Sequence, residues 1–358
     1  MNKSIIALLL LATTCYAEII ETDFRQMTGT RRLLAIRVQF PDMPNTNSYS
    51  ATVSAFAIAA DRTAQKSYHK LALIPEVTSG LYTLPHSKAY YASLATPKML
   101  AALKTDAITR AQTNGYDVSP TDYRFYDRVS VMLPPHYGLN TLTYHTEYLS
   151  VLNPTTLLHE IGHGWGFAHA GLWVVNDGNP VSPSGHSEEY GDQFDIMAQS
   201  YSTLYDKLDY NMFFKYWAGW LDDAQIATSN QVGTYTYTIN RFDNENAVGV
   251  VAVKVSAGSD FDYWVGYRRG FLNATDATKT SAHGAYIIRC PKAPRDINHS
   301  NTLFNRTELI DTQTPGTIPK DAALPIGKTL TINNITITPT AEGGTAPHEW
   351  LAIQVTRR

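Results

Sequence analysis

The chain has 358 residues, of which 44% are hydrophobic and 17% are charged, and its formal net charge is −3. This length is enough for two domains of ordinary size, each with its own hydrophobic core. The slight negative charge, without any basic block, argues against a nucleic acid as the main partner, because nucleic acids bind to basic surfaces. The sequence contains neither an internal repeat nor a low-complexity tract.

The N-terminus has the pattern of an export signal. Lys3 supplies a positive start, residues 5–12 (IIALLLLA) form a short apolar core, and Ala17 is a small residue suited to cleavage. The apolar run is too short to span a bilayer. We therefore expect a signal peptide over residues 1–17, a secreted (extracellular or periplasmic) mature protein and no membrane span in that protein. Attachment of a lipid to Cys15 is the alternative, but the residues before Cys15 fit it poorly.

Cysteine usage gives no sign of a disulfide framework. Removal of the signal peptide takes Cys15 away and leaves Cys290 as the one cysteine of the mature chain. Cys290 follows an apolar run that has the pattern of a strand, so we expect it to be a buried small apolar residue rather than a nucleophile.

Up to about residue 225 the chain alternates between strand-like and helical segments. Apolar alternation predicts strands over residues 33–40, 123–133 and 141–149. Leucine and alanine recur at helical spacing over residues 96–114, and a further helix is expected over 204–221. This mixture predicts a catalytic domain of mixed α+β structure over residues 18–228.

The pattern changes after residue 228. Short alternating or β-branched runs follow one another there, separated by glycine, asparagine, aspartate and proline. The runs cover residues 234–240, 249–255, 263–268, 285–289, 329–338 and 350–355. Strands of this length and spacing predict an antiparallel β-sandwich over residues 229–358. The whole chain is therefore expected to have an α+β fold in two domains.

One short segment, HEIGHGWGFAHA over residues 159–170, concentrates the chemistry of the chain. Asn153-Pro154 precedes it and predicts the start of a helix, with asparagine as N-cap and proline at the first helical position. On a helix, residues i and i+4 share one face, so His159 and His163 can bind the same ion.

Three further positions complete a candidate zinc site. Gly166 allows the chain to turn without steric cost, and the turn brings His169 back as a third ligand. Three protein ligands leave one tetrahedral position open for water, which distinguishes a catalytic zinc ion from a structural one. Glu160 adjoins the ligands and can accept a proton from that water. His186 and Glu188 are the alternative ligands if His169 does not bind.

The pattern H-E-x-x-H-x-x-G-x-x-H resembles that of the metzincin zinc peptidases. Downstream, EEYGDQFDIMAQS (residues 188–200) and NMFFKYWAGWLDD (211–223) are similar to segments of the gametolysin-type peptidases and, more distantly, of the immune-inhibitor-A-like peptidases. The resemblance implies a metzincin-like zincin domain, with a mixed sheet, an active-site helix and a Met-turn.

The resemblance also assigns roles. It implies one catalytic zinc ion on His159, His163 and His169, with Glu160 as general base and Met197 as the Met-turn residue. Tyr190 and Tyr201 are candidates for the oxyanion or the pocket, although a packed ring is the simpler role for each. Gln193 and Ala198 depart from the usual proline and glycine of the family, which leaves the shape of this loop and of the substrate pocket in doubt.

The expected function is that of a secreted zinc endopeptidase that hydrolyses extracellular, matrix or cell-wall proteins. Residues 141–149 are the candidate edge strand for an extended peptide substrate, and an ordinary core strand is the equal alternative. The β domain is expected to contact protein, wall or matrix. Two other functions stay open: a secreted adhesin or a carbohydrate- or protein-binding module with a vestigial site, and a zinc amidase or deacetylase acting on wall material. The sequence carries no readable signal for calcium sites or for the oligomeric state.

Overall fold

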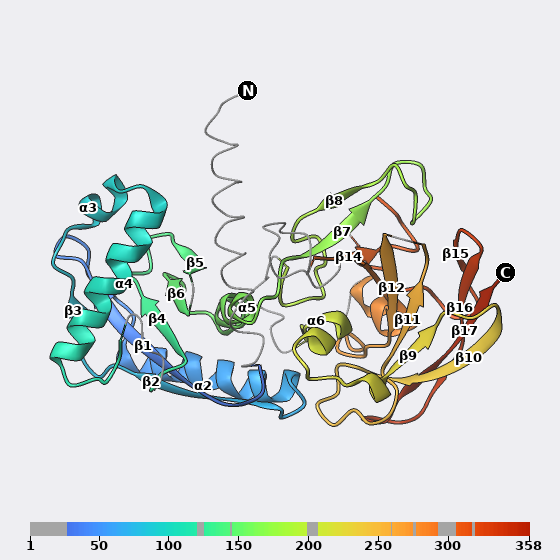
Figure 1. Cartoon of the computed structure of the whole chain (residues 1–358), viewed down its shortest axis with the longest axis horizontal. Coiled ribbons are helices and arrows are strands. Elements are labelled where there is room, and N and C mark those ends of the chain that lie inside the picture. Colours follow the sequence, from blue (N-terminus) through green and yellow to red (C-terminus); the bar gives the residue numbers. More distant parts are fainter. Residues whose placement is uncertain are drawn as a thin grey trace. The chain divides into compact units, whose positions relative to one another are not determined.

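The computed structural model describes residues 27–119, 125–143, 145–198, 207–258, 260–274, 277–292, 306–316 and 319–358. The predicted signal peptide and Tyr201 lie outside these ranges and stay predictions. The fold is of the mixed α+β kind, with several sheets and few helices (Figure 1). It divides into two compact units, one formed by the chain up to residue 64 with residues 70–166, the other by residues 65–69 with 167–358.

The first unit is built around a six-stranded sheet. Five of its strands follow the order β2-β1-β4-β6-β5, and the sixth, β3, pairs with β1. Its strands are β1 (Gly29–Gln39), β2 (Leu71–Val77), β3 (Tyr82–Thr83), β4 (Arg128–Met132), β5 (Asn140–Thr143) and β6 (Thr146–Leu149). Its helices are α2 (Tyr49–Lys66), α3 (Lys88–Ser93), α4 (Thr96–Thr113) and α5 (Pro154–Gly164). All pairings in this sheet are parallel except that between β5 and β6.

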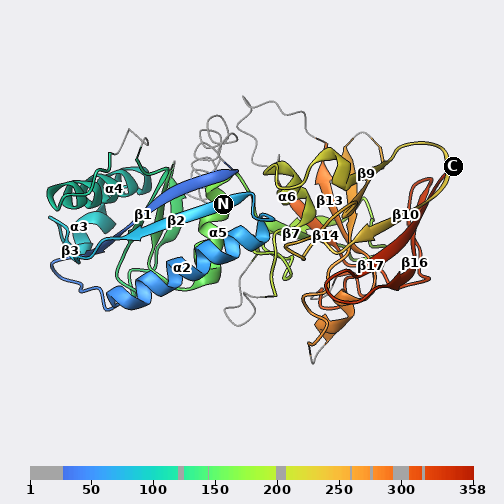
Figure 2. The same cartoon turned by 90° about the horizontal axis from the view of Figure 1, so that it is seen from below.

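Strand β1 is the centre of this unit. Residues 33–38 of β1 are all buried, as expected for a strand that is covered on both faces. Figure 2 shows α2 and α4 on opposite sides of β1 and β2. Leu103 and Ile108 of α4 join Ile36 of β1 and Val131 of β4 in one hydrophobic core. The strand predicted over residues 33–40 and the helix predicted over 96–114 are therefore confirmed as β1 and α4, whereas β4 covers only residues 128–132 of the strand predicted over 123–133, of which 123–124 lie outside the described residues.

The strand predicted over residues 141–149 is instead a hairpin. β5 and β6 pair in antiparallel register, with Thr143 opposite Thr146. The chain reverses at His145, whose backbone has a φ of 55°. Alternating polarity does not reveal a left-handed backbone at a non-glycine residue. The alternation therefore predicted one continuous strand where the chain forms two. β5 forms one edge of the sheet.

The second unit contains two sheets. The seven-stranded sheet has the order β8-β7-β14-β13-β12-β11-β9, and the four-stranded sheet has the order β10-β17-β16-β15. The strands of the larger sheet are β7 (Ala170–Val174), β8 (His186–Glu188), β9 (Ile226–Ser229), β11 (Ala252–Ser256), β12 (Phe261–Gly266), β13 (Tyr286–Pro291) and β14 (Thr307–Ile310). Those of the smaller sheet are β10 (Gly233–Asn240), β15 (Leu330–Ile332), β16 (Ile335–Gly343) and β17 (Trp350–Arg357).

Side chains from both sheets share one hydrophobic core, including Val265 of β12, Ile287 of β13 and Ile353 of β17. Among the described strands β10 to β17, all pairings with one another are antiparallel, as expected for this region. The larger sheet becomes mixed because β7 and β9 pair in parallel with β14 and β11. The expected domain boundary after residue 228 falls inside β9. The seven-stranded sheet takes strands from both sides of this boundary.

The helix expected over residues 204–221 is shorter in the described part of the chain, where α6 covers Met212–Trp217. The Asn211 side chain caps the start of α6 by accepting hydrogen bonds from the backbone N–H groups of Phe213 and Phe214, both at 3.1 Å. Two short 3-10 helices, Asp223–Gln225 and Ala277–Ala282, complete the described elements.

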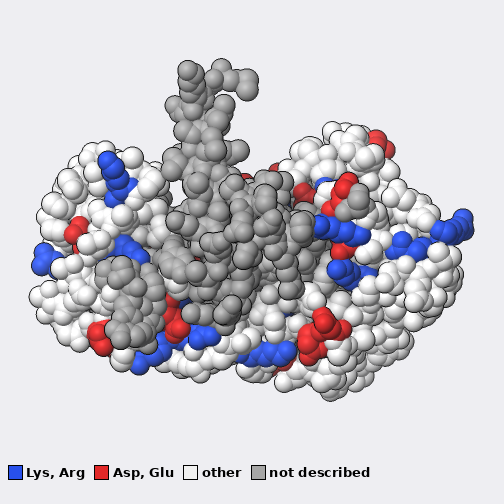
Figure 3. Space-filling model, viewed as in Figure 1, with Lys and Arg blue, Asp and Glu red and all other residues white. Residues whose placement is uncertain are grey.

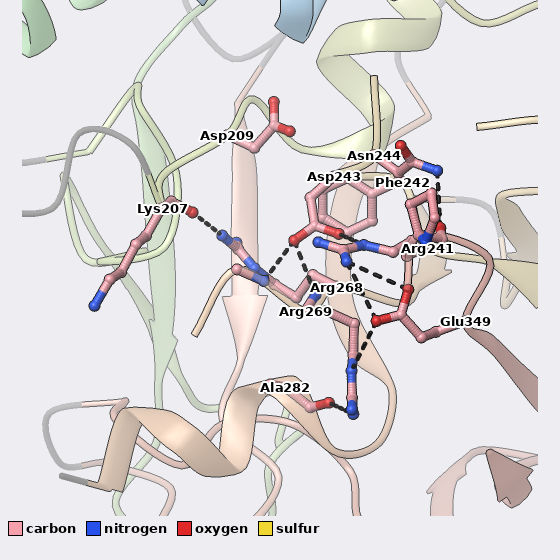
Figure 4. A network of polar contacts seen from close by, with 12 residues as sticks. Lys207, Asp209, Arg241, Phe242, Asp243, Asn244, Arg268, Arg269, Ala282 and Glu349 are labelled. Carbon is pink, nitrogen blue, oxygen red and sulfur yellow. Dashed lines mark hydrogen bonds and ion pairs between the residues drawn. The ribbon is translucent and has the colours of Figure 1, made fainter. Parts of the chain in front are cut away.

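A network of charged side chains connects the segments that follow β10 and β12 with the segment that precedes β17 (Figure 4). Asp243, which follows β10, accepts a hydrogen bond from Arg241 Nε at 2.8 Å and another from the backbone N–H of Arg269 at 2.8 Å. Arg241 Nη1 also lies 3.4 Å from Glu349, the residue before β17. Arg269 follows β12, so the network connects the loops of both sheets of this unit.

Charges of both signs are interspersed over the described residues on the face drawn in Figure 3. No helix among the described residues is both long enough and apolar enough to cross a bilayer.

Candidate metal centre

Helix α5 carries the first two histidines. The Asn153 side chain accepts a hydrogen bond from the backbone N–H of Thr155 at 2.8 Å, and Pro154 opens the helix, as predicted. Leu157, Leu158 and Ile161 are fully buried and fix the rotation of the helix about its axis.

His159 and His163 lie one turn apart on α5. Their ring centroids are 4.6 Å apart and the ring planes are almost perpendicular, at 89°. The chain leaves the helix at Trp165 and turns at Gly166, whose φ is 83° and whose backbone N–H donates to the carbonyl oxygen of His163 at 2.8 Å. This left-handed conformation is the one that glycine adopts at no steric cost.

The turn returns the chain to the two histidines. His159, His163 and His169 each offer a ring nitrogen, and these three nitrogens lie within 4.8 Å of one another. The three histidines are therefore close enough to bind one metal ion. A set of three imidazoles suits zinc, copper, iron or nickel rather than calcium or magnesium, which prefer oxygen ligands. The alternative ligands His186 and Glu188 lie on strand β8 and are not members of this group.

Glu160 directly follows His159 on α5. It is only 7% exposed, and burial, followed by the charge of Glu147, raises its pKa to about 8. Both effects disfavour the carboxylate form. A divalent cation beside Glu160 acts in the opposite direction, because it stabilises a negative charge.

Glu147 belongs to a buried polar cluster that holds the C-terminal end of α5. Its carboxylate lies 2.5 Å from Arg128 Nε and accepts a second hydrogen bond from Ser130 Oγ at 2.8 Å. Arg128 Nη1 donates to the carbonyl oxygen of Gly164, the last residue of α5, at 3.0 Å. A Cβ atom on Gly164 would lie only 2.0–2.5 Å from the Arg128 guanidinium, so a larger residue at this position requires the guanidinium to shift.

Met197 lies in a buried loop beside the third ligand. Its carbonyl oxygen accepts a hydrogen bond from the backbone N–H of Ala170 at 2.9 Å, one residue after His169. Its own N–H donates to the Asp195 carboxylate at 2.7 Å. The sequence placed Met197 near the metal by resemblance, and the described contacts bring its loop to the residue that follows His169.

Glu189 and Tyr190 contact His169 directly. Glu189 Oε1 lies 2.5 Å from His169 Nδ1, and this hydrogen bond lowers the pKa of Glu189. The Tyr190 ring centroid lies 3.8 Å from that of His169, and the Tyr190 backbone has a φ of 63°. The ring of Tyr190 thus contacts the ring of His169 and is itself 39% exposed.

Sequence reasoning missed Arg128, Glu147 and Glu189. Glu147 carried a usable signal, since a glutamate inside a short apolar strand is rarely buried without a charged partner. Arg128 opens the neighbouring strand, but the β4–β6 pairing that brings the two side chains together is not apparent from the sequence. Glu189 is one of two adjacent glutamates, and only the geometry selects it over Glu188.

No protein-family model matches the chain, and no curated protein matches it. The geometry of the residues themselves therefore carries the assignment of function.

Proposed function

We propose that this protein is a secreted zinc-dependent endopeptidase with a metzincin-like catalytic domain. The observation that carries the proposal is the group of His159, His163 and His169, whose ring nitrogens lie within 4.8 Å of one another, with Glu160 beside the first ligand on the same helix. Three histidines leave a fourth position for water or substrate, which suits a catalytic zinc ion better than a structural one. We assign the Met-turn role to Met197 by resemblance, and the hydrogen bond from the backbone N–H of Ala170 to its carbonyl oxygen supports this assignment.

His159, His163 and His169 would hold the zinc ion, which would lower the pKa of a bound water molecule and polarise the carbonyl group of the scissile peptide bond. Glu160 accepts the proton of the attacking water and then delivers it to the leaving amine. Its carboxylate suits this role because it is buried, adjoins the ligands and takes no part in the three-histidine group. Arg128 and Glu147 hold the end of α5 from which His163 projects.

The substrate is proposed to be an extended peptide of an extracellular, matrix or cell-wall protein. β5 supports this role because it is an edge strand and contacts helix α5. An edge strand presents unpaired backbone groups with which an extended peptide can pair. The two sheets of the second unit are proposed to contact the protein, wall or matrix on which the enzyme acts.

A digestion experiment tests the proposal. Purified mature protein is incubated with casein and gelatin, with and without a chelator, and the cut sites are read by mass spectrometry. We expect internal cleavage that the chelator abolishes and that added zinc restores. Intact proteins in the presence of zinc, together with release of acetate or of products with new amino groups from wall material, would contradict the peptidase and favour a deacetylase or an amidase. Inertness towards both substrates would favour a binding protein.

A further inference from the structure

We propose that Glu189 and Tyr190 are positioning residues that orient the third ligand, His169, for zinc. This inference rests on the proposed zinc site, but it concerns a different part of the chain from the motif that suggests the metal. His159 and His163 are fixed by helix α5, whereas His169 follows the turn and lies in no helix or strand. A ligand on such a segment needs side chains from elsewhere to hold its ring.

Glu189 supplies the first of these contacts. In neutral imidazole one nitrogen carries hydrogen and the other carries a lone pair. The 2.5 Å contact with the Glu189 carboxylate stabilises the form in which His169 Nδ1 carries the hydrogen and donates it. The lone pair then lies on Nε2, which is the nitrogen assigned here to the metal. A carboxylate in this position also makes the ligand nitrogen more basic.

Tyr190 supplies the second contact. Its ring lies against the His169 ring, with a centroid distance of 3.8 Å and an angle of 39° between the planes. A left-handed backbone, φ 63°, is uncommon for tyrosine and carries strain that the surrounding structure must balance. In this conformation two consecutive side chains, those of Glu189 and Tyr190, both contact His169.

The turn that carries these two residues is held on both sides by strand β7, which begins directly after His169. Before the turn, Glu188 of β8 pairs with Leu172. After it, the backbone N–H of Asp192 donates to the carbonyl oxygen of Ala170 at 3.2 Å. Between them, a Cβ atom on Gly191 would lie 2.4 Å from Leu172 Cβ, so the turn approaches β7 as closely as glycine permits. Strand β7 therefore holds the turn that carries Glu189 and Tyr190 close to His169, the residue before this strand.

The inference is tested by measuring the zinc affinity of the full mature protein in competition with a chromophoric chelator. We expect Glu189→Leu to weaken zinc binding about 10- to 100-fold, the range typical for loss of a partner of a ligating histidine. Glu189→Gln keeps an acceptor oxygen and should weaken binding less. The matched control is Glu188→Gln, because Glu188 is the adjacent glutamate, exposed like Glu189, whose side chain is not in the three-histidine group, and this variant should bind zinc like the wild type.

Tyrosine variants separate the ring from the hydroxyl. Tyr190→Phe keeps the ring and should keep the zinc affinity, whereas Tyr190→Asn accepts the left-handed backbone, removes the ring and should weaken binding. Nitrogen NMR of the metal-free protein reports the His169 tautomer directly. We expect hydrogen on Nδ1 in the wild type and a mixture of tautomers in Glu189→Leu.

Two results would overturn the inference: zinc affinity of Glu189→Leu equal to that of the wild type, or a wild-type His169 with hydrogen on Nε2. Failure of the proposed function is a separate result. In that case the wild type binds no zinc, while the tautomer of His169 still shows whether Glu189 orients the ring.

Discussion

Burial shifts the pKa values of two residues, Glu160 on helix α5 and His145 in the turn between β5 and β6. Glu160 must be ionised to accept a proton, yet its surroundings raise its pKa to about 8 in the metal-free protein. The proposed zinc ion on the adjacent histidines would supply a positive charge that favours the carboxylate. The proposed zinc ion and the ionised form of Glu160 would therefore stabilise each other.

His145, in the turn between β5 and β6, gives a prediction for the pH dependence of stability. Burial, followed by the charge of Arg128, lowers its pKa to about 4. The folded protein therefore resists protonation of His145 between pH 6.5 and 4, whereas the unfolded chain accepts the proton. The stability contributed by this residue is present above pH 6.5 and is lost as the pH falls towards 4.

The variant His145→Asn removes the titrating group and tolerates the left-handed backbone at this position. Urea unfolding at a series of pH values should show the wild type losing up to about 3 kcal/mol more than this variant between pH 7 and pH 4. Parallel pH profiles for the two proteins would show that His145 does not titrate as a buried group.

At the scale of elements, the C-terminal end of α5 depends on a side chain from β4. The last carbonyl groups of a helix lack partners within it. Here the carbonyl oxygen of Gly164 receives the Arg128 guanidinium, which also occupies the space of a Cβ atom on that glycine. The same arginine is neutralised by the buried Glu147.

We expect Gly164→Ala to destabilise the protein by about 1–3 kcal/mol, because the added methyl group overlaps with the guanidinium. In the background Arg128→Ala/Glu147→Gln the guanidinium is absent, so the same change at Gly164 should cost clearly less. Denaturant unfolding of the four proteins measures this coupling. Equal costs in both backgrounds would mean that Arg128 does not restrict position 164.

The elements also differ in how far the sequence predicts them. α5 could be predicted because its cap, its first proline, its apolar face and its histidine spacing are all local signals. α2 was missed although it has 18 residues and a local start signal, in which the Ser48 side chain accepts a hydrogen bond from the backbone N–H of Ala51 at 3.1 Å. The contacts of Glu189 with His169 and of Arg128 with Gly164 depend on strand pairing and a left-handed turn, which a single sequence does not encode locally.

At the scale of the whole molecule, the second unit needs strands from before the expected domain boundary. β9 pairs with β11, and β7 pairs with β14. A fragment of residues 230–358 lacks β7, β8 and β9, and it leaves β11 and β14 as uncovered edges. Uncovered edges of this kind favour aggregation.

We therefore expect the fragment 230–358 to aggregate or to unfold without cooperativity, and the fragment 167–358 to unfold in one cooperative transition. Circular dichroism during heating, with light scattering as a control for aggregation, distinguishes the two. A cooperative transition of 230–358 at the temperature seen for 167–358 would contradict the role of these strands.

The central claim is that Glu160 moves protons and does not hold the metal. It is tested by comparing Glu160→Ala with the wild type for zinc content, melting temperature and casein hydrolysis. We expect about one zinc per chain in both proteins, similar melting temperatures, and a rate reduced by about 10⁴ or more in the variant, since general acid–base catalysis contributes about 10² to 10⁴ and this carboxylate acts in both proton transfers. A variant that keeps its zinc and hydrolyses casein as fast as the wild type would contradict the account.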